Sequence, residues 1–206
     1  MPFVRKAFFD AVRVSLFDAV LKRHQVAGLT AILDRGESAV ALDDRWLAYM
    51  LATAHHETGR TMQPVRETFA ASDARAIVLL DRAFEQGRLP SVSTPYWRRD
   101  VEGKTWLGRG LVQLTHRANY EKMTLATGVD LIAQPERAME MGVAVDILFI
   151  GMQTGAFTGK RLGQYFSQDK EDWTGARRII NSRDRAALVA GYGRRYLAAL
   201  RDARAA

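Results

Sequence analysis

The chain of 206 residues carries 30 lysines and arginines against 23 aspartates and glutamates, a formal net charge of +7. Hydrophobic residues make up 48% and charged residues 26%, which are ordinary globular values and exclude a disordered or collagen-like chain. The absence of cysteine excludes a disulfide scaffold, a cysteine-ligated zinc site and a thiol nucleophile. The length predicts one domain, or one domain built from two lobes.

The N-terminal part of the chain predicts amphipathic helices. Apolar residues recur at helical spacing over residues 8–20 and again over residues 29–33. Asp43 and Asp44 can cap a helix that ends near Gly59.

The remainder predicts further helices around one irregular stretch. Residues 89–106 contain two prolines and two tryptophans, and they predict a loop or a short hairpin. No run of alternating β-branched residues indicates a large sheet, so we expect a mainly α fold with at most a small β element. The predicted helices are 72–87, 119–127, a long buried helix over 135–152, 176–180 and 184–203.

Glu57 combines two features that favour an uncharged carboxyl group. It shares an apolar stripe with Met50 and Ala54, and it lies in the last turn of its helix. Desolvation and the partial negative charge of a helix C-terminus both favour the protonated form. A carboxyl group that keeps its proton is what a general acid needs. The alternative is a partly exposed Glu57 that pairs with Arg60 or another cation.

The adjacent histidines His55 and His56 do not predict a metal site. Metalloprotease helices place two histidines four residues apart so that both face one ion. Neighbouring residues of a helix point about 100° apart. We expect His56 to hydrogen-bond near Glu57 and fix the orientation of its carboxyl group.

A second carboxylate, Glu67, follows in a connection that contains Pro64. Glycosidic hydrolysis uses two acidic residues, one to protonate the leaving oxygen and one to activate water or stabilise the cationic sugar. Glu57 and Glu67 are candidates for these two roles. The alternative for Glu67 is an ion pair with the neighbouring Arg66.

Residues 106–120 form a third informative segment. Gly108 and Gly110 allow a tight backbone path or a positive φ. Gln113, Thr115 and Asn119 offer amide and hydroxyl groups that can bind sugar hydroxyl and N-acetyl groups, and Thr115 could help to hold a water molecule. No Lys-Ser/Thr pair follows the glycines, so the segment is not a Walker-type phosphate-binding loop.

These segments, in this order, resemble the family 19 glycoside hydrolases, and specifically their bacteriophage endolysin branch. The resemblance covers most of the chain, and several linked motifs are more specific than any one of them. The matching segments are His-Glu-Thr-Gly at 56–59, Thr-Met-Gln-Pro-Val-Arg-Glu at 61–67, Gly-Arg-Gly-Leu-Val-Gln-Leu-Thr at 108–115, Gly-Met-Gln-Thr-Gly-Ala-Phe-Thr-Gly at 151–159 and Ala-Arg-Arg-Ile-Ile-Asn at 176–181.

The resemblance implies a lysozyme-like, two-lobed fold. We expect residues 1–206 to form a single catalytic domain without a separate wall-binding module. The resemblance implies an enzyme that inverts the configuration at the anomeric carbon. The general acid of the family corresponds to Glu57, and the hydroxyl that assists the attacking water corresponds to Thr115. No metal or organic cofactor is implied. The candidate substrate-binding residues are His56, Trp106, Gln113, Asn119, Tyr120 and Asn181.

The chain departs from the family pattern in ways that leave some contacts open. The best position for the second carboxylate is Glu67, with Glu102 as a competitor. The chain reads Arg-Glu-Thr-Phe at 66–69 where many relatives read Arg-Glu-Tyr-Gly, which affects substrate contacts rather than the chemistry. Aromatic side chains of the irregular stretch could stack on sugar rings or pack in the core; these are Tyr96, Trp97 and Trp106.

The sequence therefore predicts an endolysin or muramidase-type enzyme that cleaves β-1,4 bonds of bacterial peptidoglycan during host cell lysis. A chitinase acting on chitin oligomers would use the same chemistry. A non-enzymatic nucleic-acid-binding protein is indicated only by the positive charge. No helix-turn-helix or zinc-finger spacing supports that alternative, so we expect no nucleic-acid partner. We also expect a monomer.

The positive charge is concentrated at the C-terminal end. From residue 177 onward there are eight arginines and two aspartates, whereas the preceding chain is nearly neutral. This excess indicates an anionic wall or outer-membrane surface as a partner, and the alternative is a solvated helix face. Apolar residues of this helix are spaced to dock on the core, namely Leu188, Tyr192, Tyr196 and Leu200. The arginines are Arg177, Arg178, Arg183, Arg185, Arg194, Arg195, Arg201 and Arg204.

No segment predicts a signal peptide or a membrane span. Asp10, Arg13 and Asp18 interrupt the N-terminal stretch before a long apolar run forms. The most apolar stretch, residues 143–152, contains Asp146 and is too short to cross a bilayer. We expect the protein in the host bacterial cytoplasm before release and at the periplasmic cell wall when it acts.

Overall fold

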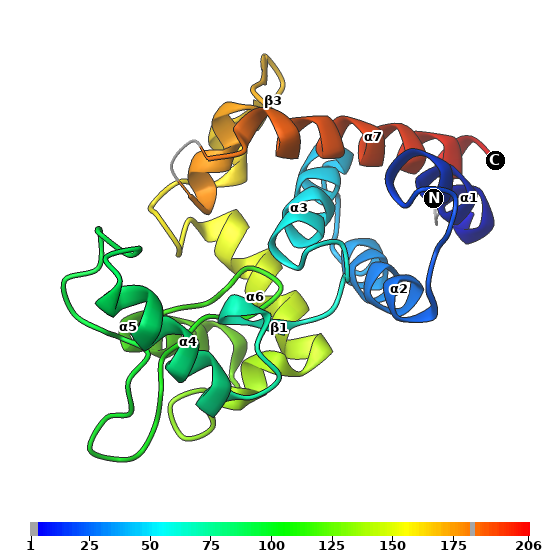
Figure 1. Cartoon of the computed structure of the whole chain (residues 1–206). Coiled ribbons are helices and arrows are strands. Elements are labelled where there is room, and N and C mark those ends of the chain that lie inside the picture. Colours follow the sequence, from blue (N-terminus) through cyan, green and yellow to red (C-terminus); the bar gives the residue numbers. More distant parts are fainter. Residues whose placement is uncertain (1–3, 182–183) are drawn as a thin grey trace. The chain divides into compact units, whose positions relative to one another are not determined.

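The computed structural model describes residues 4–181 and 184–206. These residues are mainly helical, with two small two-stranded sheets, which confirms the expected fold class (Figure 1). The chain divides into two compact units. We call Met1–Gln63 with Leu148–Ala206 the first unit, and Pro64–Ile147 the second unit.

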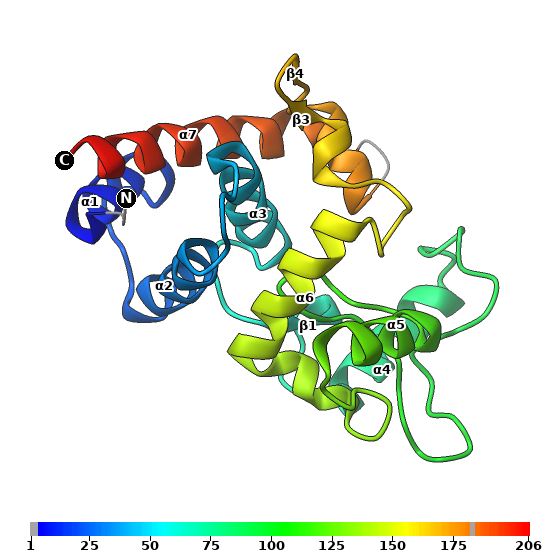
Figure 2. The same cartoon turned by 180° about the vertical axis from the view of Figure 1, so that it is seen from behind.

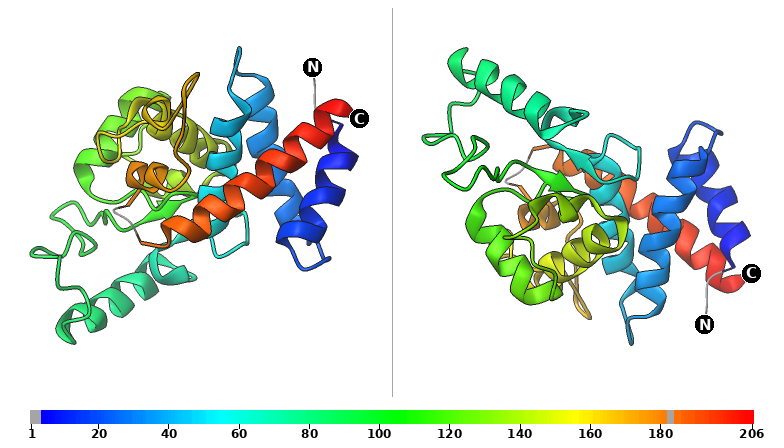
Figure 3. Two further views of the ribbon diagram at one scale, coloured as in Figure 1. Left: turned by 90° about the horizontal axis from the view of Figure 1, so that it is seen from above. Right: turned by 90° about the horizontal axis from the view of Figure 1, so that it is seen from below.

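The first unit is organised around the last helix of the chain. Helix α7 (Ala186–Ala205) packs along both α1 (Arg5–Leu16) and α3 (Asp44–Glu57), as Figures 1 and 2 show from opposite sides and Figure 3 from above and below. Helix α2 (Arg23–Glu37) contacts α3. Short elements complete the unit, with η marking 3-10 helices: η3 (Leu162–Gln164), β3 (Phe166–Ser167), β4 (Lys170–Glu171) and η4 (Gly175–Ile179).

A glycine of α7 leaves room for the Trp173 ring. A Cβ atom at Gly193 would come within 2.6 Å of the Trp173 ring and 3.5 Å of the Tyr49 ring. Tyr196 and Leu200 are fully buried, as the apolar spacing predicts. Leu188 differs, because 42% of its surface stays exposed.

The second unit combines short strands with helices. Strand β1 (Val65–Arg66) pairs antiparallel with β2 (Arg109–Gly110), with Val65 opposite Gly110 and Arg66 opposite Arg109. The other elements are η1 (Glu67–Phe69), α4 (Asp73–Glu85), α5 (Arg117–Thr127), η2 (Pro135–Met139) and the first part of α6 (Met141–Thr154), which crosses the unit boundary. A core cluster of this unit consists of Ala76, Leu80, Trp97 and Leu107.

Side chains cap the starts of two helices, α3 at the predicted Asp43 and α4 at Ser72. The Asp43 side chain accepts a hydrogen bond of 2.8 Å from the Arg45 N–H at the start of α3. The Ser72 side chain accepts one of 3.2 Å from the Arg75 N–H at the start of α4. Each cap satisfies a backbone donor that the helix itself leaves unpaired.

The long helix predicted over 135–152 is wrong in one respect. The structure divides it into η2 and α6, because Glu140 adopts an extended backbone conformation with φ −69° and ψ 130°. The Ala144 N–H then donates to the Glu140 carbonyl, which starts α6. Apolar periodicity continues across both pieces, so the sequence pattern does not reveal a single extended residue between them. Across the described chain, no helix has the length and apolarity needed to cross a bilayer.

His55 lies in the core of the first unit. Its Nδ1 shares a hydrogen bond of 2.9 Å with the Tyr196 hydroxyl, and its ring packs against Tyr192 and Phe17. Burial, reinforced by nearby positive charge, lowers the pKa of His55 to about 3. The imidazole is therefore neutral in the folded protein at pH 5 to 7.

The buried His55 should make folding stability depend on pH. The unfolded chain takes up a proton near pH 6.5 that the folded protein takes up only near pH 3. Stability from this residue is thus complete above about pH 6.5 and falls as the pH drops, by about 2 kcal/mol at pH 5.

Chemical denaturation of the wild type and His55→Gln at pH 7 and pH 5 measures this effect. The variant should lose less stability between the two pH values than the wild type does. His24→Gln, at an exposed position, should behave like the wild type. Equal losses in the wild type and His55→Gln would contradict the prediction.

Candidate functional site

Glu57 is the last residue of α3 and forms an ion pair inside the first unit. The Arg177 Nη1 donates to Glu57 Oε1 over 2.5 Å. Arg177 comes from η4 and is almost completely buried, while the Glu57 side chain is 16% exposed. The Arg177 Nε also donates to the Asp184 carbonyl, which holds the guanidinium in place.

The expectation of a Glu57 carboxyl group without a cation is therefore wrong. The alternative, that Glu57 pairs with a cation, is correct, but that cation is not Arg60. Gly59 and Arg60 both have positive φ values, and Arg60 instead donates to Asp18 and to the Leu16 carbonyl. Arg177 replaces it from 120 residues away in the sequence.

His56 is half-buried beside this pair. Burial lowers the pKa of His56, and the charges of Arg177 and Arg185 act in the same direction against the opposing charge of Glu57. We expected His56 to orient the Glu57 carboxyl group through a hydrogen bond. The hydrogen bond observed at that carboxyl group comes from Arg177 instead. Within the described residues, no group of three or more His, Asp or Glu side chains is placed to hold a metal ion.

Glu67 lies at the start of η1 in the second unit, and both of its carboxyl oxygens accept hydrogen bonds. The Tyr96 hydroxyl donates to Oε1 over 2.7 Å, and the Gly108 N–H donates to Oε2 over 2.8 Å. Burial and the charge of Glu67 raise the pKa of Tyr96, which keeps its hydroxyl protonated as a donor. The alternative pairing with Arg66 is not formed, because Arg66 pairs with Asp73.

Gly108 has no side chain, which leaves room for two neighbouring side chains that pack against its backbone. A Cβ atom at this position would lie 2.7 Å from Gln113 Oε1 and 3.3 Å from the Glu67 side chain. The Gln113 Nε2 donates to the Val65 carbonyl over 3.0 Å, which ties this side chain to β1. Glu67, Gly108 and Gln113 thus form one local cluster.

Thr115 follows a second short bridge to β2. The Glu67 N–H donates to the Gly108 carbonyl, which continues the β1–β2 register by one residue. Arg109 and Leu114 form a second antiparallel bridge. Thr115 comes directly after Leu114, and the next backbone bond, from the His116 N–H to the Trp106 carbonyl, does not continue the register of that bridge. The Asn119 side chain donates to the Thr115 carbonyl over 2.9 Å and steadies this segment.

Two expected substrate-binding residues are buried instead. Trp106 is only 6% exposed, and Tyr120 is completely buried against it with ring centroids 5.4 Å apart. Neither ring has a free face for a sugar, which corrects their assignment. Trp97 is likewise fully buried and belongs to the core. Asn181 is exposed in the first unit, and its N–H donates to the Arg177 carbonyl.

Glu102, the competitor for the second carboxylate, has a different setting. It lies in an exposed turn and pairs with Lys104 over 3.0 Å. Glu67 is fixed by two neutral donors and remains partly exposed, so its setting suits a catalytic carboxylate better.

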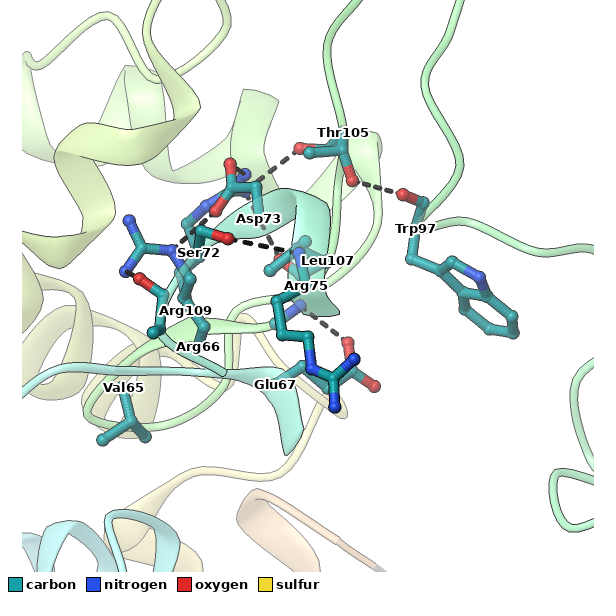
Figure 4. A network of polar contacts seen from close by, with 12 residues as sticks. Val65, Arg66, Glu67, Ser72, Asp73, Arg75, Trp97, Thr105, Leu107 and Arg109 are labelled. Atoms are coloured by element: carbon teal, nitrogen blue, oxygen red, sulfur yellow. Dashed lines mark hydrogen bonds and ion pairs between the residues drawn. The ribbon is translucent and has the colours of Figure 1, made fainter. Parts of the chain in front are cut away.

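An ion pair that the sequence did not predict joins the buried Arg109 of β2 to Asp73 of α4 (Figure 4). Arg109 donates to Asp73 over 2.5 Å, to the Tyr120 hydroxyl over 2.8 Å and to the Thr105 carbonyl over 3.0 Å. Burial alone would raise the pKa of Asp73, but Arg109 and Arg66 lower it below its usual value. Burial raises the pKa of Tyr120 to about 12. The only local signal was an arginine between two glycines.

The C-terminal arginines differ in how they are used. Arg204 pairs with Asp44 through two contacts of 2.8 Å, and Arg195 donates to the Ser15 carbonyl. Arg177 is buried with Glu57, whereas Arg194 is exposed beside the Trp173 ring. Arg183 lies outside the described residues. Part of the positive charge is therefore used within the fold.

No protein-family model, curated protein or solved structure matches the chain. The function has to be inferred from the residues and contacts described above. The two carboxyl groups, Glu57 in the first unit and Glu67 in the second, are the starting point for that inference.

Removing Asp73 should destabilise the second unit. Asp73→Ala leaves the Arg109 guanidinium buried without its carboxylate, which should cost about 3–5 kcal/mol of unfolding free energy. Urea denaturation followed by circular dichroism measures the cost. Adding Arg109→Met should recover part of the loss, because the unpaired charge is then gone.

Glu121→Ala is the matched control. Glu121 pairs with Arg117 on the exposed face of α5 over 3.1 Å, and its loss should cost less than about 1 kcal/mol. A cost for Asp73→Ala no greater than for Glu121→Ala would show that the Arg109 pair is not a structural anchor.

Proposed function

We propose that the protein is a glycoside hydrolase that cleaves β-1,4 bonds of bacterial peptidoglycan by an inverting acid–base mechanism. The observation that carries the proposal is the setting of Glu67. Both of its oxygens are held by neutral donors, and the Gln113 side chain lies against the same glycine, Gly108. This is the kind of oriented, partly exposed carboxylate that can draw a proton from water.

Glu67 acts as the general base in this proposal. The Tyr96 hydroxyl and the Gly108 N–H restrict the rotation of its carboxyl group without neutralising it. In this proposal, Thr115 helps to position the water that attacks the anomeric carbon. The water oxygen forms the new bond to that carbon, and Glu67 receives its proton.

Glu57 acts as the general acid. The structure shows the Glu57 carboxyl group hydrogen-bonded to Arg177, and the acid step needs a proton on that carboxyl group. Glu57 therefore takes up a proton from solvent before the bond breaks. Arg177 then stabilises the carboxylate that forms when this proton passes to the leaving oxygen. Inversion requires about 6.5–9.5 Å between the two carboxyl groups when a sugar chain is bound.

The substrate proposal rests on the sequence resemblance to the phage endolysin branch. Peptidoglycan supplies β-1,4-linked N-acetylated sugars, which amide and hydroxyl side chains such as Gln113 and Asn119 can bind. Mass spectrometry of digested peptidoglycan would identify the new reducing-end sugar and so the bond that is cut. Chitin oligomers assayed in parallel would test whether the lactyl-peptide substituents of the wall are required.

Removing either carboxyl group should abolish hydrolysis. Glu67→Gln keeps the size of the side chain but cannot accept a proton, and we expect at least a 100-fold loss of kcat. Glu57→Gln should lose a similar amount, and it should also unfold more easily because buried Arg177 loses its counter-charge. Release of reducing ends from purified peptidoglycan measures the rate at a temperature where circular dichroism shows each variant folded.

Glu102→Gln is the matched control for the second carboxylate. It should retain wild-type turnover and wild-type clearing of chloroform-treated Gram-negative cells. An inactive Glu102→Gln beside an active Glu67→Gln would exchange the assignments. Full activity of folded Glu57→Gln would remove the acid from the mechanism.

Tyr96 is a positioning residue, and its hydroxyl can be removed alone. Tyr96→Phe deletes one of the two hydrogen bonds that orient Glu67 and should lower kcat roughly tenfold with little change in KM. Steady-state kinetics on soluble peptidoglycan fragments separates the two constants. A change confined to KM would mean that Tyr96 contacts the sugar rather than orienting Glu67.

A further inference from the structure

Phe69 is an aromatic residue in an unusual position. Of the Phe69 surface, 62% is exposed. Among residues 4–181 and 184–206, every other phenylalanine, tyrosine and tryptophan is buried or partly buried. Soluble proteins usually bury such rings, because an exposed phenylalanine gives up the stabilisation that burial supplies. Its position two residues after Glu67 sets it apart from the aliphatic side chains that are also exposed.

The backbone that presents this ring is strained. Thr68 has a φ of 62° and Phe69 has a φ of 56°. A positive φ is a genuine outlier for a β-branched or bulky side chain, and each such residue costs on the order of 1–3 kcal/mol. Glycine would adopt the same conformation without this cost. The segment thus keeps two unfavourable residues next to each other beside a candidate catalytic carboxylate.

Contacts on both sides hold the segment in this conformation. On one side, the Glu67 N–H donates to the Gly108 carbonyl. On the other side, Arg66 binds Asp73 and the Ala71 carbonyl, and Ser72 caps α4. The turn between these anchors cannot relax without breaking them.

Core packing does not explain the ring. The cluster formed by Ala76, Leu80, Trp97 and Leu107 takes in the next residue, Ala70, as a partly buried neighbour. Phe69 is not among the residues described as packing against that cluster. The turn therefore directs a small side chain inward and the large aromatic one into solvent.

We propose that Phe69 is a substrate-binding platform on which the apolar face of a sugar ring stacks, next to the bond on which Glu67 acts. The Cα atoms of Glu67 and Phe69 are at most about 7 Å apart, a span comparable with one hexose unit. Sugar rings carry C–H groups on one face, and an aromatic ring offers a rigid apolar surface for them. This inference rests on the proposed function and assigns one of its substrate contacts.

The test compares Phe69→Ala with two aromatic replacements, Phe69→Tyr and Phe69→Trp. The probe is the β-1,4-linked tetramer of N-acetylglucosamine, with binding measured by calorimetry and KM and kcat measured on purified peptidoglycan. Phe69→Ala should weaken tetramer binding about tenfold and raise KM by a similar factor, with kcat little changed. Both aromatic variants should restore binding, since they keep a flat apolar ring.

The matched control is Leu125→Ala on α5 of the same unit, whose side chain is also exposed. It should bind the tetramer as the wild type does. Circular dichroism and thermal unfolding should show Phe69→Ala as folded as the wild type, since the ring contributes little buried surface. These controls separate loss of a platform from general loss of structure or surface hydrophobicity.

Each outcome decides the proposal. Tetramer binding by Phe69→Ala equal to the wild type would overturn it, as would failure of both aromatic variants to restore binding or failure of the wild type to bind the tetramer. A wild type that binds the tetramer through Phe69 but hydrolyses no peptidoglycan would support the platform and remove the proposed function. A wild type that hydrolyses peptidoglycan with unchanged KM in Phe69→Ala would support the function and remove the platform.

Discussion

Two buried guanidinium groups determine where the candidate catalytic side chains lie. Arg109 in the second unit and Arg177 in the first are the buried arginines of the described chain. A buried charge costs several kcal/mol unless a carboxylate offsets it, so each arginine requires its partner. Arg109 fixes Asp73 and with it the turn that carries Glu67, whereas Arg177 fixes Glu57 itself.

The two carboxyl groups consequently have different surroundings. Glu57 faces a cation, while Glu67 accepts hydrogen bonds from a hydroxyl and an amide that carry no charge. In the proposed mechanism, Glu57 has to give a proton and Glu67 has to receive one. The contacts that hold Glu67 also hold Phe69 in a strained turn. The stability of the second unit therefore maintains the exposed position of this aromatic ring.

Local sequence patterns predicted the features that depend on neighbouring residues. The cap at Asp43 and the mainly α class follow from residues within a few positions of each other. Glu57 and Glu67 were predicted from the order of the sequence motifs alone, without any structural information. The helix break at Glu140 was not predicted, because one extended residue leaves the apolar periodicity on either side unchanged.

By itself, the sequence determined which segments become helices and which polar side chains belong to the candidate site. Only the tertiary structure decided their partners. Arg177 reaches Glu57 from 120 residues away, and Tyr96 reaches Glu67 from 29 residues away. Trp106 was chosen for a sugar and is buried instead. The physical reason is that helix formation is governed by short-range periodicity and capping, whereas pairing and burial depend on contacts between distant segments that form when the chain packs.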